Sequence, residues 1–286
     1  MTSPKAEQAM HGVFLGMATT SIIIVLLICV FLFGSGLPAI KQIGVDAFLF
    51  GREWSPADIP PLFGIFPMIL GSIYITLGAI LLGVPIGILT AVFMSRFCPE
   101  NIYKIMKPCI DLMAGIPSIV FGFFGMMLLV PFVRTALGGN GSSMLTASIL
   151  LGIMILPTVI AVSESAIRAV PANYYEGAVA LGASHERSIF CVVLPAARSG
   201  IMASVVLGIG RAIGETMAVI MVAGNQARVP DSILQGVRSL TANIVLEMGY
   251  AADLHREALI ATGVILFVMI LAINLSFLVL NKKEYT

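Results

Sequence analysis

The chain has 286 residues, of which 58% are hydrophobic and only 11% are charged. A typical soluble domain carries roughly 25% charged residues, so this composition excludes an ordinary water-soluble fold and favours a protein embedded in lipid. The formal net charge of +1 gives no indication of a nucleic-acid partner.

Six stretches of the chain are apolar enough to form a membrane-spanning helix. Five of them coincide with long gaps between charged residues, and each can supply the about 20 residues that a helix needs to cross a bilayer. The predicted spans are approximately 12–33, 66–94, 111–133, 143–163, 200–223 and 257–281. These spans predict an all-α integral membrane fold, and residues 1–286 are expected to form a single transmembrane domain.

A cleaved signal peptide is the alternative interpretation of the first stretch. Its apolar run, 12–33, is longer than the roughly 7–15 residues of a typical signal core, so an uncleaved span is expected. Six spans place both termini on the same side of the membrane. If that side is the inside, the internal segments hold nine Lys and Arg residues and the external ones six, which predicts cytoplasmic termini by the positive-inside rule.

Several residues along these spans predict how the helices meet the membrane and one another. Trp54, in the external segment 35–65, is expected to be an anchor at the membrane surface. Pro117, at the start of the third span, should kink that helix and face the bundle. The second span contains small residues that allow close helix packing. These are Gly71, Gly78, Gly83 and Gly87.

The segment 164–199, between the fourth and fifth spans, is too long for a simple connection. Pro171 suits the start of a helix, Gly182 breaks it, and Ser184 can cap a second helix. Pro195 is expected to end or kink that second helix before the fifth span. Because such an elbow has no role in crossing a membrane, we expect it to be a cytoplasmic docking surface.

Motifs of enzymes and metal sites are missing from the sequence. There is no G-x-x-x-x-G-K-[ST] phosphate loop, so ATP hydrolysis by that route is not expected of this chain. The four cysteines and three histidines have no metal-ligand spacing, and a packing role is the default interpretation of the cysteines. The chain is therefore expected to be neither an enzyme nor a holder of its own cofactor.

The elbow resembles the EAA loop of ABC-importer permeases. That loop reads E-A-A, three residues, G, nine residues and I-x-L-P. Here the sequence reads Glu176-Gly177-Ala178, then Gly182, then Val192-Val193-Leu194-Pro195, with Gly for Ala and Val for Ile as departures. The resemblance implies a type I ABC-importer transmembrane domain. It also implies that the matching positions form a coupling helix seated in a cleft of the ATPase subunit: Glu176, Ala178, Gly182, Leu194 and Pro195.

Two further stretches, 114–122 and 210–218, resemble the phosphate permeases. The run Thr216-Met217-Ala218-Val219 is similar to the PstC type, whereas the PstA type tends to read Thr-Ala-Pro after the glutamate. The resemblance implies a second, PstA-like permease, two PstB-like ATPase subunits that bind ATP and Mg, a PstS-like phosphate-binding protein, and contact with membrane lipid. It places the assembly in the cytoplasmic membrane of a bacterium or archaeon.

Arg211 and Glu215 are charged residues within the fifth predicted span. Four positions apart on a helix, they share a face and are expected to be able to pair. Either they form a structural ion pair, or Arg211 lines an anion path with Glu215 holding its guanidinium. Both interpretations of this pair stay open at the level of sequence.

Three alternative functions of the whole chain also stay open: a sulfate or molybdate permease, a secondary transporter, and a non-transporting scaffold.

Overall fold

The computed structural model describes residues 4–282, which are mostly helical. The longer helices are α1 (Pro4–Ile43), α3 (Phe66–Val92), α4 (Glu100–Gly115), α7 (Met144–Arg168), α11 (Arg198–Gly214) and α14 (Asp253–Lys282). The shorter ones are α2 (Val45–Phe50), α5 (Ser118–Phe124), α6 (Val130–Leu137), α8 (Ala172–Ala180), α9 (His185–Ser188), α10 (Leu194–Ala196), α12 (Met217–Val222) and α13 (Leu240–Glu247). Three π-helical turns are η1 (Phe93–Phe97), η2 (Gly125–Leu129) and η3 (Ile189–Val193). Strands β1 (Trp54–Ser55) and β2 (Leu62–Phe63) form an antiparallel hairpin.

The described residues confirm the predicted all-α membrane fold. Five helical segments are long and apolar enough to cross a bilayer, and a sixth crossing results if a pair bent by 68° counts as one. The five are Met10–Ile43, Phe66–Phe97, Ser118–Leu137, Met144–Arg168 and Asp253–Phe277. The bent pair is His185–Ala196 with Arg198–Gly214.

The start of the predicted third span, 111–133, is wrong. Helix α4 ends at Gly115, and the crossing helix begins at Ser118. Ile116 is extended, with φ −68° and ψ 127°, because the ring of Pro117 disfavours helical backbone in the residue before it. Pro117 therefore separates two helices, where a kink within one helix was the sequence prediction.

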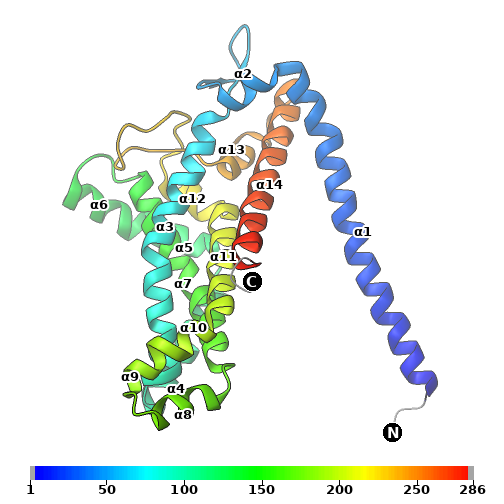
Figure 1. The fold of residues 1–286 in the computed structure, drawn as a ribbon. Coiled ribbons are helices and arrows are strands. Elements are labelled where there is room, and N and C mark those ends of the chain that lie inside the picture. Colours follow the sequence, from blue (N-terminus) through cyan, green and yellow to red (C-terminus); the bar gives the residue numbers. More distant parts are fainter. Residues whose placement is uncertain (1–3, 283–286) are drawn as a thin grey trace.

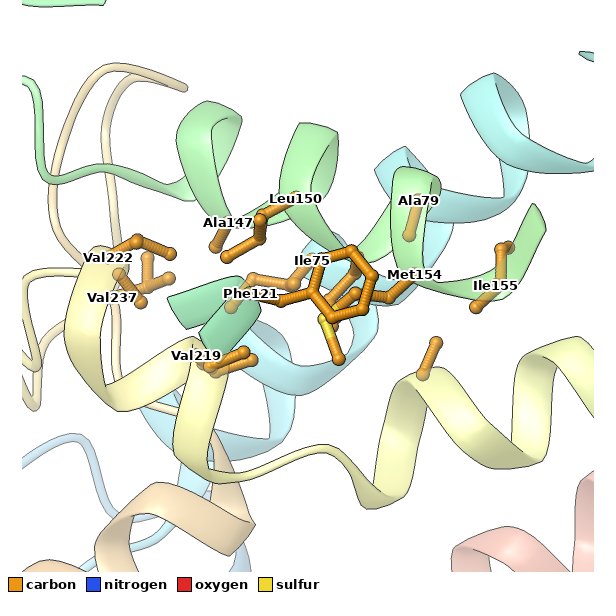
Figure 2. Packing of buried hydrophobic residues seen from close by; sticks show 14 of the residues in the cluster. Ile75, Ala79, Phe121, Ala147, Leu150, Met154, Ile155, Val219, Val222 and Val237 are labelled. Carbon is orange, nitrogen blue, oxygen red and sulfur yellow. The ribbon is translucent and has the colours of Figure 1, made fainter. Parts of the chain in front are cut away.

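Helices α3, α7 and α11 lie side by side in the centre of the bundle (Figure 1). The predicted role of the α3 glycines is confirmed, since a Cβ on Gly83 would lie 2.6 Å from the carbonyl oxygen of Gly152 in α7. Ile75 and Ala79 of α3 pack with Leu150 of α7 and with α5 and α12 in a buried apolar cluster (Figure 2). This close packing holds α7 firmly against α3.

Helix α1 leaves the bundle over most of its length (Figure 1). Residues 10–28 are exposed although most are large and apolar, as expected of a helix surrounded by lipid or by a neighbouring subunit. Only its last part packs against α14, where a Cβ on Gly36 would lie 2.6 Å from Cγ2 of Val264. Helix α1 begins at the end of the molecule where α8 and α9 lie.

Candidate functional site

The sequence between α7 and α11 folds into the expected helix–glycine–helix elbow, residues 172–188. Gly182 has φ +86°, a backbone conformation that glycine adopts without the strain other residues incur. Its amide donates to the carbonyl of Val179 at 2.8 Å, which closes the end of α8. The Oγ of Ser184 accepts from the amide of Arg187 at 3.3 Å and caps α9. The predicted glycine break and serine cap are confirmed.

The outer surface of the elbow is open. Helix α8 has no buried residue, Glu176 is exposed, and Ala178 is half-buried. A Cβ on Gly182 would meet no atom within 4 Å, and the neighbouring Leu181 is 92% exposed. A hollow of about 370 Å³ lies beside them, lined by Leu181, Gly182, Ala183, Ser184 and Arg187. This arrangement leaves room for a partner side chain at the elbow.

The last two residues of the motif lie away from this surface. Leu194 is half-buried against an apolar cluster that includes Met94 and Ile189. Pro195 is exposed at the start of α10, just before the 68° bend into α11. Leu194 and Pro195 therefore lie between the elbow and the bend into α11, while Glu176, Ala178 and Gly182 belong to the elbow itself.

Arg211 and Glu215 do not form the expected ion pair. Helix α11 ends at Gly214, and Glu215 is extended, with φ −70° and ψ 129°, so the two residues no longer share a helix face. The Glu215 carboxylate instead accepts from the amides of Thr216, at 3.1 Å, and Ala218, at 3.3 Å. It thereby caps α12 and satisfies amides that have no partner within that helix. The predicted continuous span 200–223 is broken at this point.

Arg211 is half-buried near the end of α11, and Nη1 of its guanidinium donates to Oγ1 of Thr158 in α7 at 3.1 Å. A Cβ on Gly210 or Gly214 would meet no atom within 4 Å, so open space lies next to Arg211. Gly208 differs, because its Cβ would contact Val159 of α7. Arg211 thus combines a fixed charge with free volume beside it.

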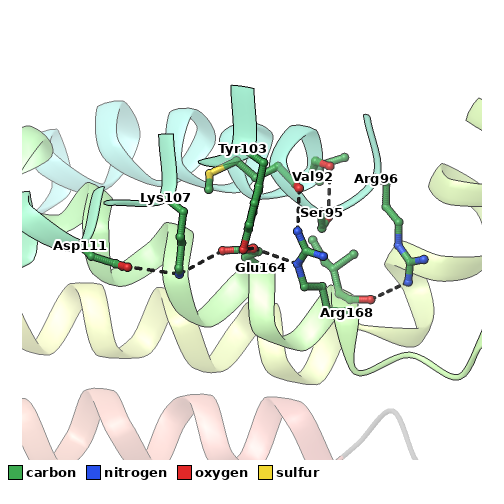
Figure 3. A network of polar contacts seen from close by, with 10 residues as sticks. Val92, Ser95, Arg96, Tyr103, Lys107, Asp111, Glu164 and Arg168 are labelled. Carbon is green, nitrogen blue, oxygen red and sulfur yellow. Dashed lines mark hydrogen bonds and ion pairs between the residues drawn. The ribbon is translucent and has the colours of Figure 1, made fainter. Parts of the chain in front are cut away.

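A buried carboxylate, which the sequence alone did not single out, lies at the elbow end of α7 (Figure 3). Glu164 is 3% exposed and accepts from the Tyr103 hydroxyl at 2.7 Å, from Nε of Arg168 at 2.9 Å and from Nζ of Lys107 at 3.2 Å. The Arg168 guanidinium also lies 4.7 Å from the centre of the Tyr103 ring. These contacts tie α4 to α7 by charge-assisted hydrogen bonds.

The Glu164 carboxylate shifts the ionisation of its two partners on α4. The hydrogen bond to Glu164 raises the pKa of Tyr103 above its ordinary value, because the phenol must keep its proton to donate. Burial lowers the pKa of the Lys107 ammonium, but the hydrogen bond and negative charge of Glu164 outweigh it, so this pKa is raised. Both shifts indicate that Tyr103 and Lys107 hold their protons at neutral pH.

A second buried network lies at the opposite end of the molecule, around Glu247. Its carboxylate accepts from Nη1 of Arg238 at 2.6 Å and from Nε1 of Trp54 at 2.8 Å, and it lies 2.9 Å from Nε2 of His255. Trp54 is half-buried and packs edge-on against Phe63 and His255. Trp54 therefore fastens the β-hairpin to α13 and α14, a role that the sequence did not predict.

Comparison with known proteins identifies the chain at family level. The sequence profile of the binding-protein-dependent transport system inner membrane component matches residues 83–284. The chain belongs to this family. As a member of the binding-protein-dependent permeases, it is a transporter subunit of an ABC importer, and its family is not an enzyme family.

Relatives of this permease cover most of its length. It is 39% identical over 247 residues to the probable ABC transporter permease protein YqgH of Bacillus subtilis, an alignment covering 85% of this chain and 80% of YqgH. It is 34% identical over 291 residues to the phosphate transport system permease protein PstC of Mesorhizobium japonicum, covering 94% of this chain and 86% of that PstC. The predicted resemblance to PstC is confirmed.

Solved structures of importers share the fold. A bacterial alginate ABC transporter in complex with an alginate pentasaccharide-bound periplasmic protein has a TM-score of 0.64 at 18% identity, covering 95% of this chain and 94% of that chain. An amino acid ABC transporter has a TM-score of 0.57 at 19% identity, covering 77% of this chain and 93% of that chain. These likenesses confirm the ABC-importer transmembrane fold of the permease.

Proposed function

We propose that this permease carries inorganic phosphate inward across the cytoplasmic membrane of a bacterium or archaeon, as one subunit of an ATP-driven importer. The observation that carries this proposal is the likeness to proteins named PstC over nearly the whole chain, 94% of it in the Mesorhizobium protein. The same name recurs in relatives from Xylella fastidiosa, at 32% identity, and Methanocaldococcus jannaschii, at 31%.

In this proposal the chain is a single transmembrane domain, 1–286, that works within a larger assembly. A second, PstA-like permease encloses the pathway with it, and a PstS-like phosphate-binding protein delivers the substrate from outside. Two PstB-like ATPase subunits bind ATP and Mg and receive the elbow, while this chain holds no cofactor. Both termini are cytoplasmic. The open surface around Gly182 supports a docking role for the end of the molecule that carries the elbow.

Arg211 is proposed to line the anion path. A guanidinium keeps its charge at any relevant pH, and its planar set of donors matches phosphate oxygens. Thr158 holds one nitrogen, and open space beside Gly210 and Gly214 leaves room for an ion. Since a pathway must release its ion, a single arginine suits transport better than an enclosed cluster of donors. Glu215 supports the site indirectly, by ending α11 and capping α12.

Uptake of radiolabelled phosphate into proteoliposomes containing the complete complex tests this function. We expect ATP-dependent uptake that excess unlabelled phosphate abolishes, whereas competition by sulfate or molybdate alone would refute phosphate as the substrate. Uptake that persists without ATP would indicate a secondary transporter.

Arg211→Gln tests the role of the arginine. This variant should lose uptake while it still assembles and docks the binding protein. Arg228→Gln, an exposed position on the external loop, is the matched control and should transport normally. Because Glu215 caps α12 and does not pair with Arg211, the double variant Arg211→Gln with Glu215→Gln should stay inactive. Restored uptake in the double variant would refute the pathway role.

A further inference from the structure

The side chain of His185 joins the elbow to the end of α3. Its Nδ1 lies 2.8 Å from the Tyr175 hydroxyl within the elbow, and its Nε2 lies 3.2 Å from the carbonyl oxygen of Arg96 in η1. A carbonyl oxygen can only accept, so Nε2 carries a proton and donates across to η1. Both ring nitrogens are therefore engaged, one on each side of the junction.

Aromatic packing holds the same ring in place. The His185 ring meets Phe97 edge-on, with centroids 5.0 Å apart and an interplanar angle of 78°, and Tyr175 at 5.6 Å and 79°. Edge-on geometry of this kind is the favoured arrangement of aromatic rings. His185 is exposed, yet two hydrogen bonds and two aromatic rings fix its orientation. A residue that merely begins a surface helix needs none of these contacts.

From η1 the contacts continue to α7 (Figure 3). Arg96 donates through Nη2 to the carbonyl of Ile167 at 2.8 Å, and Arg168 donates in return to the carbonyl of Met94 at 3.0 Å. Each element thus supplies an arginine that bonds the backbone of the other. The end of α3 and the end of α7 are crosslinked in both directions, and Glu164 anchors Arg168 from within.

Helix α7 also carries the residue that holds Arg211. Thr158, which accepts from Arg211, lies nine positions before Ile167, or about 13.5 Å along the helix at 1.5 Å per residue. The tight packing of α3 on α7, where a Cβ on Gly83 or Gly87 would clash with α7, leaves these two helices little freedom to slide past each other. A displacement of the elbow that reaches η1 therefore reaches Thr158 as well.

We propose that His185 is a positioning residue that transmits movement of the elbow, through η1, to α7 and thus to Arg211. This rests on the proposed function, in which the elbow receives the ATPase. The physical basis is a continuous set of hydrogen bonds and packed rings between the two sites. Without His185 the elbow still binds the ATPase through Gly182 and its neighbours, but less of its movement is passed on to the pathway, because only the apolar cluster around Met94 and Ile189 still joins the elbow to η1.

The test compares hydrolysis with uptake in proteoliposomes that contain the complete complex and the loaded binding protein. His185→Ala removes both hydrogen bonds and the ring, and it should lower phosphate transported per ATP hydrolysed about tenfold. The ATPase subunits should still copurify, and hydrolysis should continue. Tyr175→Phe keeps the ring packing and removes one hydrogen bond, so the ratio should fall about threefold. His185→Gln, which can still donate to the Arg96 carbonyl, should recover part of the loss.

Other outcomes would overturn the proposal. An unchanged ratio in both His185→Ala and Tyr175→Phe would show that the junction transmits nothing. Loss of the ATPase subunits from the purified His185→Ala complex would mean that His185 serves docking. A parallel loss of hydrolysis and uptake at constant ratio would also refute it. Failure of wild-type complexes to take up phosphate would instead refute the proposed function, so the two failures are distinguishable.

Discussion

Replacing Glu164 by glutamine keeps the shape of the side chain and removes the charge on which three donors converge. Hydrogen bonds to charged groups each contribute about 1.5–3 kcal/mol, and the amide of glutamine would point a donor at one of the existing donors. The side chains of Lys107 and Arg168 are 32% and 47% exposed, so hydrogen bonds to water replace part of their lost interaction with the carboxylate. We therefore expect a destabilisation of about 2–3 kcal/mol, less than the about 3–5 kcal/mol of a fully buried pair.

Thermal unfolding in detergent, followed by a thiol-reactive dye, measures this loss. Cys98 is half-buried close to η1 and reports the opening of this region. Cys109 and Cys191 are exposed, contrary to the packing role expected of the cysteines, and are replaced by serine together with Cys29.

Asp111→Asn is the matched control for Glu164→Gln. Asp111 also contacts Lys107, at 3.5 Å, but its side chain is 57% exposed, so we expect less than about 0.5 kcal/mol. If Glu164→Gln unfolds at the same temperature as this control, Glu164 is not a charged anchor and the estimate is wrong.

Three further predictions concern the elbow, the orientation and the packing. Gly182→Asp should abolish ATP hydrolysis stimulated by the binding protein without preventing insertion into the membrane. A side chain at φ +86° strains the backbone by about 1–2 kcal/mol, and it occupies the open surface of the elbow. Normal uptake by this variant would contradict the docking role. In a cysteine-free background, Ser184→Cys should react with a membrane-impermeant thiol reagent only from the cytoplasmic side and Asn140→Cys only from outside, and the reverse labelling would overturn the orientation. Gly83→Ala should lower the unfolding midpoint by an amount corresponding to about 1–3 kcal/mol, because its Cβ would force α3 and α7 apart. Gly115→Ala, with no atom within 4 Å of the new Cβ, is its control, and equal stability of the two variants would refute the close-packing argument.

The features that the sequence predicted well depend on neighbouring residues. The elbow follows from Gly182 and Ser184, whose effects on the backbone are felt within a few positions. The two helix breaks were harder to foresee, because hydropathy measures how apolar a stretch is and says little about where its backbone turns. Glu215 illustrates this: in sequence it is a partner for Arg211 on one helix, but its carboxylate caps the next helix.

The buried networks could not be predicted because their members are distant in the chain. Tyr103 is 61 positions from Glu164, and Trp54 is 193 positions from Glu247. Only the spacing of Glu164 and Arg168, an acid and a base four apart at the end of an apolar span, gave a local signal. When an apolar span ends in an acidic residue, Lys, Arg and Tyr residues distant in the sequence are therefore candidates for its partners.

The contact between α1 and α14 joins the first helix of the described residues to the last of them, and this has a consequence for the order of assembly during synthesis. Gly36 and Ala39 of α1 meet Ala261 and Val264 of α14, residues that are synthesised long after α1. During synthesis α1 must therefore remain in the bilayer without α14, which its mostly apolar surface allows, since the hydroxyls of Thr19, Thr20 and Ser21 bond to carbonyls of the helix itself. A ribosome stalled before α14 would leave a chain whose central helices can pack but whose helix α1 lacks the neighbour on which it mainly packs.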